Sequence, residues 1–309
     1  MIDEIERLRK KALNKTLICI AVIILIIIIS IKFLIIIPAL IVFEIIIGIS
    51  ITILITRKDS KAFSDLYKKE IVVTAFNQIC TDVQFNLDYG IPYETIASTE
   101  MMYMGDRYSS NDYITGKYKN INFEMSDVEI EEEHEDSEGH TNYVTIFKGQ
   151  WYIFDFNKSF KANIQVCEKS FRNSRRKNLF VKKEEKYKKV ELEDIEFNKV
   201  FKVYAQNELD AFYVLTPNTM QRLKIVNNKI AGDLLFCFID NRLHIGLYNN
   251  RDLFEASIFK KVDINKATQK TLGEISIITN FVDILSLDND LFKTQGGGVI
   301  QWVMALSLL

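Results

Sequence analysis

Residue types that usually build catalytic or metal sites are scarce in this sequence. Its 309 residues include three histidines and four cysteines. The cysteines, Cys19, Cys80, Cys167 and Cys237, lie far apart and form no CxxC pair, so neither a zinc site nor a redox motif is indicated. We interpret them as small core residues of a protein in a reducing compartment.

Motifs of the common enzyme classes are also missing. The GGGV near the C-terminus lacks the GK[ST] ending of a phosphate-binding loop, and neither GxSxG nor HExxH occurs. A net charge of −2 points to neither nucleic acid nor an acidic partner. We expect no cofactor and no metal, and the sequence favours a non-enzyme without deciding the question.

Isoleucine and leucine, in contrast, are abundant and fill one run at residues 17–56. The run is about twice the roughly 20 residues that one helix needs to cross a bilayer, so two spans fit better than one. Lysines and arginines flank both ends, which is typical of cytoplasmic flanks. We expect a multi-pass protein of the inner (plasma) membrane with both termini in the cytoplasm.

Pro38 marks the expected turn of this hairpin, because it leaves about 20 residues on each side. Lys32 precedes it by six positions and Glu44 follows it by six, so each lies roughly 9 Å from the tip and the two charges can pair. A turn at residues 30–32 is the alternative, and it would leave Glu44 without an opposite charge. We interpret the pair as a structural clasp, with an ion or proton relay as the functional alternative.

After the membrane run, residues 60–80 have the apolar spacing of an amphipathic helix. A short helix near residues 92–102 and a loop are expected next. From residue 116 the pattern becomes that of strands, and two β-rich runs on either side of Lys148-Gly149-Gln150 predict a hairpin there. The segment ANIQVCE predicts a further strand.

In the second half of the chain, LTPN predicts a helix with Thr216 as its cap and Pro217 as its first residue, ending near residue 227. LLFCFIDNRLHIGLY predicts a hairpin that turns at Asp240-Asn241. Residues 266–287 have the spacing of a second amphipathic helix.

The predicted fold class is therefore α+β: an N-terminal two-helix transmembrane hairpin, then a cytosolic antiparallel β-rich domain with flanking amphipathic helices. We divide the chain into a basic N-terminus (1–16), the hairpin (17–56), a juxtamembrane helix and connector (57–115), the soluble domain (116–287) and an irregular tail (288–309).

Two blocks of opposite charge stand out. Residues 127–138 are acidic and contain His134, with His140 close by, and we interpret them as a solvated strand edge or loop rather than a metal site. Residues 169–189 are basic and could contact anionic lipid headgroups, although they could equally face the acidic block or a partner, or be a solvated loop. The candidate lipid contacts are Arg172, Arg175, Arg176, Lys177, Lys182 and Lys183.

Three blocks, DYITGKYKNINFEMSDVEIE, TIFKGQWYIFDFNKSF and VELEDIEFNKVFKVYAQNELDAFYVLTP, resemble a family of bacterial membrane-anchored proteins whose domain has no known function. The resemblance covers most of residues 60–285. It implies a hydrophobic hairpin, a juxtamembrane helix and a β-rich domain, and an association with membrane proteins of the LemA type. It implies no activity and no catalytic residue.

Our leading hypothesis is a scaffold or binding module that is anchored in the lipid bilayer and faces the cytosol. Two alternatives remain: a membrane-tethered hydrolase acting on lipid or nucleotide, and a transport or sensing accessory that uses Lys32 and Glu44.

Overall fold

The computed structural model describes residues 2–34, 39–135, 139–155, 163–172, 186–285 and 287, without the side chains of residues 31–34 and 39–41. The chain forms two compact units. The hairpin unit comprises Met1–Gln78 and Phe254–Glu274, and the sheet unit comprises Ile79–Leu253 and Ile275–Leu309.

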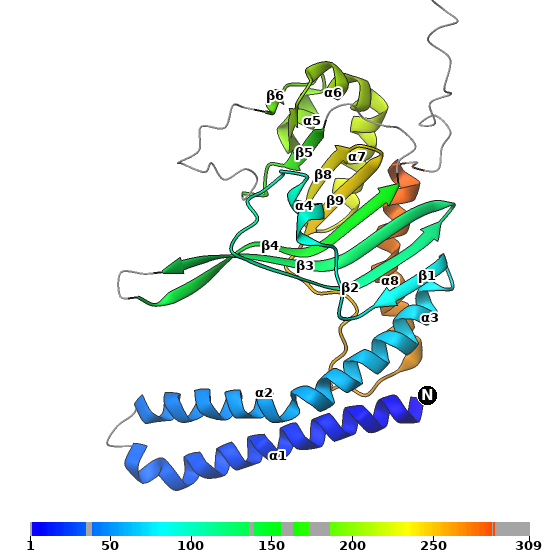
Figure 1. The fold of residues 1–309 in the computed structure, drawn as a ribbon. Coiled ribbons are helices and arrows are strands. Elements are labelled where there is room, and N and C mark those ends of the chain that lie inside the picture. Colours follow the sequence, from blue (N-terminus) through cyan, green and yellow to red (C-terminus); the bar gives the residue numbers. More distant parts are fainter. Residues whose placement is uncertain are drawn as a thin grey trace, which may run out of the picture. The chain divides into compact units, whose positions relative to one another are not determined.

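Two long antiparallel helices dominate the hairpin unit (Figure 1). Helix α1 spans Ile2–Leu34 and α2 spans Ala39–Tyr67. Helix α1 continues through residues 30–32, so the alternative turn is not the one found, and the interruption falls between Leu34 and Ala39. Pro38 itself lies outside the described residues. Within the described part of the chain, one helix, Ile2–Ser30, is long and apolar enough to cross a membrane.

Helix α2 is extended by a π-helical segment, η1 (Lys68–Val72), and by α3 (Val73–Phe76), which together form the helix expected over residues 60–80. Their buried face carries Phe63, Tyr67, Ile71, Val72, Ala75 and Phe76.

A segment from far along the sequence completes the hairpin unit. Arg9 Nη1 donates to the carbonyl oxygen of Ile258 at 2.9 Å, and the amide of Val262 donates to Glu6 Oε1 at 2.8 Å. Lys68 Nζ pairs with Glu255 Oε1 at 2.6 Å. The basic start of α1 is therefore a packed part of this unit.

One antiparallel sheet of nine strands forms the sheet unit in the described residues, in the order β1-β2-β3-β4-β9-β8-β5-β7-β6 (Figure 1). The strands are β1 (Thr81–Asn86), β2 (Arg107–Tyr118), β3 (Ile121–Glu135), β4 (Thr141–Asp155), β5 (Ile164–Glu168), β6 (Lys188–Val190), β7 (Phe201–Ala205), β8 (Asp233–Ile239) and β9 (Arg242–Tyr248). The antiparallel α+β class is confirmed.

The helices that accompany this sheet are α4 (Tyr93–Ala97), α5 (Ile195–Val200), α6 (Glu208–Val214), α7 (Pro217–Lys229) and α8 (Ile264–Leu285). Helix α8 belongs to the hairpin unit up to Glu274 and to the sheet unit from Ile275.

Apolar residues cover both faces of the sheet, because side chains alternate along each strand. On one face, Phe281 of α8 packs against Tyr152 and Phe154 with ring centroids 5.2 and 6.0 Å apart. On the other face, Trp151 and the strand residues beside it pack against the segment around α4. This second core contains Ile91, Ile96, Met101, Met102, Val128, Ile130, Ile146, Phe147, Ile153, Cys167, Phe171, Leu235 and Cys237.

Some predicted elements are wrong in detail. Strand β4 runs unbroken through Gly149, so no hairpin forms at Lys148-Gly149-Gln150. The helix expected over residues 92–102 is the shorter α4. The loop expected after residue 102 contains the first half of β2, and β1 was not predicted. The hairpin of β8 and β9, the strand β5 and the helices α7 and α8 are confirmed.

Thr216 caps α7 as expected, and its Oγ1 accepts a hydrogen bond from the amide of Thr219 at 3.3 Å. We expect Thr216→Ala to lower the free energy of unfolding by about 1 kcal/mol, because one helix-end amide loses its acceptor. Urea denaturation of the full chain in detergent measures this. Thr216→Ser keeps the acceptor and should stay near the wild type, so an equal loss in both variants would contradict the capping role.

Candidate functional site

The hairpin is held together by a seam with a seven-residue period. Along α1, the less exposed positions from 5 to 23 recur at alternating steps of four and three. This spacing keeps one face of a helix against its neighbour. The seam residues are Ile5, Arg9, Ala12, Thr16, Cys19 and Ile23.

Gly48 brings the two helices close together at Ile23, the last of these seam residues. A Cβ atom at this position would lie 2.7 Å from Cγ1 and 2.8 Å from Cδ1 of Ile23. Small residues at such a crossing let two helices approach closely. Both Gly48 and Ile23 also line a groove between the two helices.

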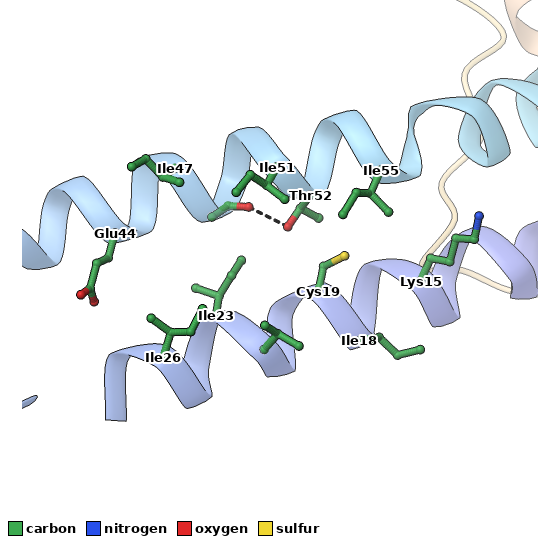
Figure 2. A pocket seen from close by; sticks show the side chains of 12 residues that line it. Lys15, Ile18, Cys19, Ile23, Ile26, Glu44, Ile47, Ile51, Thr52 and Ile55 are labelled. Atoms are coloured by element: carbon green, nitrogen blue, oxygen red, sulfur yellow. Dashed lines mark hydrogen bonds between the residues drawn. The ribbon is translucent and has the colours of Figure 1, made fainter. Parts of the chain in front are cut away.

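A groove of about 490 Å³ opens beside this contact, between α1 and α2 (Figure 2). Its walls are almost entirely aliphatic. The hydroxyl of Thr52 is already satisfied, because it donates to the carbonyl oxygen of Gly48 at 2.8 Å. The lining residues are Lys15, Ile18, Cys19, Val22, Ile23, Ile26, Glu44, Ile47, Gly48, Ile51, Thr52 and Ile55.

Ionisable side chains stand at both ends of the groove, with Lys15 at one end and Glu44 at the other (Figure 2). Beyond Lys15, Asp59 is 6% exposed and pairs with Lys15 and, at 2.9 Å, with Lys11. These two lysines hold the pKa of the Asp59 carboxyl below its usual range, the Lys15 contact contributing most.

Glu44 accepts a hydrogen bond from the hydroxyl of Ser30 on α1 at 2.9 Å. The spacing in the sequence predicted Lys32 as the partner of Glu44, and the contact with Ser30 was not predicted. Lys32 belongs to α1, but its side chain lies outside the described residues, so the pair stays a prediction. The signal available in the sequence was the serine itself, since it is a rare polar residue in an aliphatic run.

The basic block at residues 169–189 lies only partly in the described part of the chain. Arg172 is described and exposed. The other candidate lipid contacts, Arg175, Arg176, Lys177, Lys182 and Lys183, lie outside the described residues. Within the acidic block, Glu129 pairs with Lys148 at 3.0 Å and Glu131 with Arg107 at 3.4 Å. Basic residues on neighbouring strands therefore neutralise part of the negative charge of this block.

The sheet unit carries a second, polar cavity of about 310 Å³. Arg242 bridges two carboxylates in it, with Nη1 at 3.3 Å from Glu124 Oε1 and Nε at 3.9 Å from Asp155 Oδ1. Tyr113 donates to Glu124 Oε2 at 2.6 Å, and burial followed by this carboxylate raises the pKa of the Tyr113 phenol. The remaining lining residues are Asp82, Thr115, Gly116, Lys117, Asn122, Phe123 and Ile153.

This cavity offers mixed charge. It has three carboxylates and two cationic groups, which suits a small polar ligand that both donates and accepts hydrogen bonds. The cavity could not be predicted from the sequence, because its residues come from five strands that only the sheet register brings together.

A buried carboxylate lies on β3. Asp127 is 3% exposed, and it accepts from Gln150 Nε2 at 2.9 Å and from the amide of Leu253 at 3.0 Å. Gln150 also donates to the carbonyl oxygen of Arg251 and accepts from Asn249. Burial, assisted by the charge of Asp112, raises the pKa of Asp127 to about 8, although the Gln150 hydrogen bond opposes this.

His244 is a core residue, and burial lowers its pKa to about 4. Its Nδ1 accepts from the indole nitrogen of Trp151 at 3.3 Å, so the neutral ring carries its proton on Nε2. Cys80, Cys167 and Cys237 are buried, whereas Cys19 lines the groove. In the described part of the chain, no group of three or more His, Cys, Asp or Glu residues could hold a metal ion.

Comparison with known proteins gives a domain family rather than an activity. No curated protein matches the chain. A crystal structure of the mycobacterial trehalose monomycolate transport factor A, TtfA, is similar at 9% sequence identity and a TM-score of 0.38, covering 72% of this chain and 95% of that one. Residues 145–287, from β4 to just beyond α8, match the family described as "Protein of unknown function (DUF3137)", which confirms the resemblance to a domain family without a known function.

Proposed function

We propose that this protein is a membrane-anchored binding module, with α1 and α2 crossing the bilayer as a hairpin and the sheet unit in the cytosol. The observation that carries the proposal is the outer surface of the hairpin. In the described side chains of residues 17–30 and 42–55, most of the exposed ones are large and apolar, as in Ile29 at 69% and Leu54 at 71% exposure. An apolar surface this extensive is typical of a membrane or protein contact.

The dimensions agree with two crossings. From residue 17 to 34 and from 39 to 56, each helix offers about 18 residues, or about 27 Å, to a hydrocarbon core of about 30 Å. The lysines and arginines beyond residues 17 and 56 favour the cytoplasm for both ends. The inner membrane is therefore the proposed location.

Cysteine labelling in intact cells tests the topology. In a Cys19→Ala background the other three cysteines are buried, so Ala39→Cys and Lys58→Cys supply the reactive thiols. An impermeant maleimide should label Ala39→Cys from outside and Lys58→Cys only after lysis. Labelling of Lys58→Cys from outside would overturn the orientation, and protection of Ala39→Cys would reduce the crossing to a shallow insertion.

The polar cavity supports binding as the role of the sheet unit, and Arg242 is the residue we expect to contact the ligand or partner. A photo-crosslinking residue at Thr115, inside the cavity, should give a discrete adduct that Arg242→Ala abolishes. The matched position is exposed Lys199 on α5, which should give none. The implied partner is a membrane protein of the LemA type, and anionic headgroups are the proposed contact of the basic block around Arg172.

A further inference from the structure

The end of the hairpin groove at Lys15 has an excess of positive charge. The ammonium groups of Lys11 and Lys15 both contact a single carboxylate, that of Asp59. The cluster therefore keeps a net charge of about +1, and it stands where α1 enters the apolar run. Basic pockets between membrane helices on the cytoplasmic side are typical sites for anionic lipid headgroups.

The groove also has a definite depth. Along α1 its lining runs from Lys15 to Ile26, and along α2 from Ile55 to Glu44. Each stretch covers about 11 residues, or about 17 Å, which matches one leaflet of about 15 Å rather than the whole core of about 30 Å. A second transmembrane helix would contact the hairpin over its full depth, so the groove suits an alkyl chain better.

The polarity of the groove fixes the orientation of such a chain. The walls between the ends are aliphatic apart from Cys19 and Thr52, and the Thr52 hydroxyl already donates to the helix backbone. Glu44 at the deep end would repel a second anion, whereas Lys15 at the shallow end would attract one. Only one direction therefore combines favourable charge with apolar contact.

We propose that this groove holds one acyl chain of an anionic phospholipid from the cytoplasmic leaflet, with the lipid phosphate at Lys11 and Lys15. The inference rests on the proposed function, because the hairpin must lie in a bilayer. It concerns residues separate from the basic block around Arg172, and it gives the anchor a lipid preference of its own.

The test uses the full chain in nanodiscs made of equal parts phosphatidylcholine and phosphatidylglycerol. Native mass spectrometry then measures which lipid stays bound after transfer to detergent. One net positive charge near an anionic headgroup contributes about 1 kcal/mol, which corresponds to about a fivefold preference. We therefore expect phosphatidylglycerol to be enriched about fivefold over the bulk.

Two variants should move this ratio in opposite directions. Lys11→Gln with Lys15→Gln should bring the enrichment to 1 or below, because Asp59 then repels the phosphate. Asp59→Asn should raise it to about 25-fold, because both lysines then act on the lipid. A rise is a result that general damage to the hairpin could not give.

Arg57→Gln with Lys58→Gln is the matched control, since both residues are exposed and removing them takes away the same charge next to Asp59. This pair should leave the fivefold preference in place. An equal loss in both double variants would mean unspecific surface attraction and would overturn the proposal. Cys19→Phe should fill the groove and reduce the retention of both lipids.

Carbonate extraction of cell membranes that contain the full chain separates the two proposals. A chain that is washed from the membrane would refute the anchor itself. A chain that stays in the membrane but shows no preference for phosphatidylglycerol would refute the lipid site alone. Efficient Cys19–Cys19 crosslinking between chains would show that a second copy fills the groove, which would also overturn the lipid assignment.

Discussion

The stability of the sheet unit should fall as the pH rises from about 6.5 to 8, and Asp127→Asn should abolish that fall. The physical reason is proton binding. Burial raises the pKa of Asp127 to about 8, whereas a free aspartate in the unfolded chain has a pKa of about 3.9. The folded state therefore holds this proton more tightly, and its advantage, complete below pH 3.9, is lost as the pH rises to 8.

His244 acts in the opposite direction over a lower range. Its pKa is about 4 in the folded state and about 6.5 in the unfolded chain, so its contribution is complete above pH 6.5 and is lost as the pH falls toward 4. The two effects oppose each other between pH 4 and 6.5. Above pH 6.5, Asp127 is the one of these two residues that still titrates. The free energy of unfolding should then fall by up to about 1.4 kcal/mol per pH unit, or by about 2 kcal/mol in total between pH 6.5 and 8.

Chemical denaturation of the full chain in detergent at half-unit pH steps measures the effect. Asp127→Asn should be less stable than the wild type at pH 6, because Gln150 and Leu253 donate to different oxygens of Asp127 and the NH2 group of an asparagine would face one of these donors. Its stability should be flat from pH 6.5 to 8. Glu129→Gln, two residues along β3 and paired with Lys148 near the surface, is the control and should keep the wild-type slope. A fall that persists in Asp127→Asn would assign it to another group.

Gly149→Ala should strongly destabilise the sheet unit. A Cβ at this position would lie 2.0 Å from the carbonyl oxygen of Leu247, which belongs to the neighbouring strand β9. Gly149 also has a φ of 156°. The clash is with backbone rather than with a movable side chain, so we expect a loss of about 3 kcal/mol in the free energy of unfolding.

The matched control is Gly273→Ala in α8. Apart from its chain neighbours and the backbone of its own helix, no atom lies within 4 Å of a Cβ built there, and alanine favours a helix over glycine by about 1 kcal/mol. Thermal unfolding of the full chain should therefore shift downward for Gly149→Ala and upward for Gly273→Ala. Equal shifts would mean that the contact with Leu247 relaxes at no cost.

Elements with strong local signals could be predicted from the sequence. The Thr216-Pro217 start of α7, the Asp240-Asn241 turn and the apolar period of α8 each depend on neighbouring residues, and the structure confirms all three. The resemblance to a domain family without a known function also came from contiguous blocks.

Elements that depend on distant partners could not be predicted. The residues around Gly149 locally favour a turn. Pairing with β3 on one side and with β9 on the other keeps β4 extended through this position. Strand β1 has little apolar alternation of its own and forms because β2 supplies its hydrogen bonds.

The candidate sites show the same limit. The charged residues of the hairpin were visible, yet the contact of Ser30 with Glu44 and the cluster at Asp59 depend on how two helices align in register. The polar cavity and the Asp127 network join residues from strands and loops that are far apart in sequence. Geometry of this kind is set by tertiary packing, which a single sequence does not reveal.

The late segment of the hairpin unit has a consequence for biosynthesis. Glu255, which pairs with Lys68, is 187 residues further along the chain. At ribosomal rates of about 5 to 20 residues per second, α1 and α2 are complete roughly 10 to 40 s before that segment emerges. During this interval Arg9 and Lys68 lack their late contacts, so a nascent chain arrested before residue 254 should be more accessible to proteases at the base of its hairpin than the finished protein.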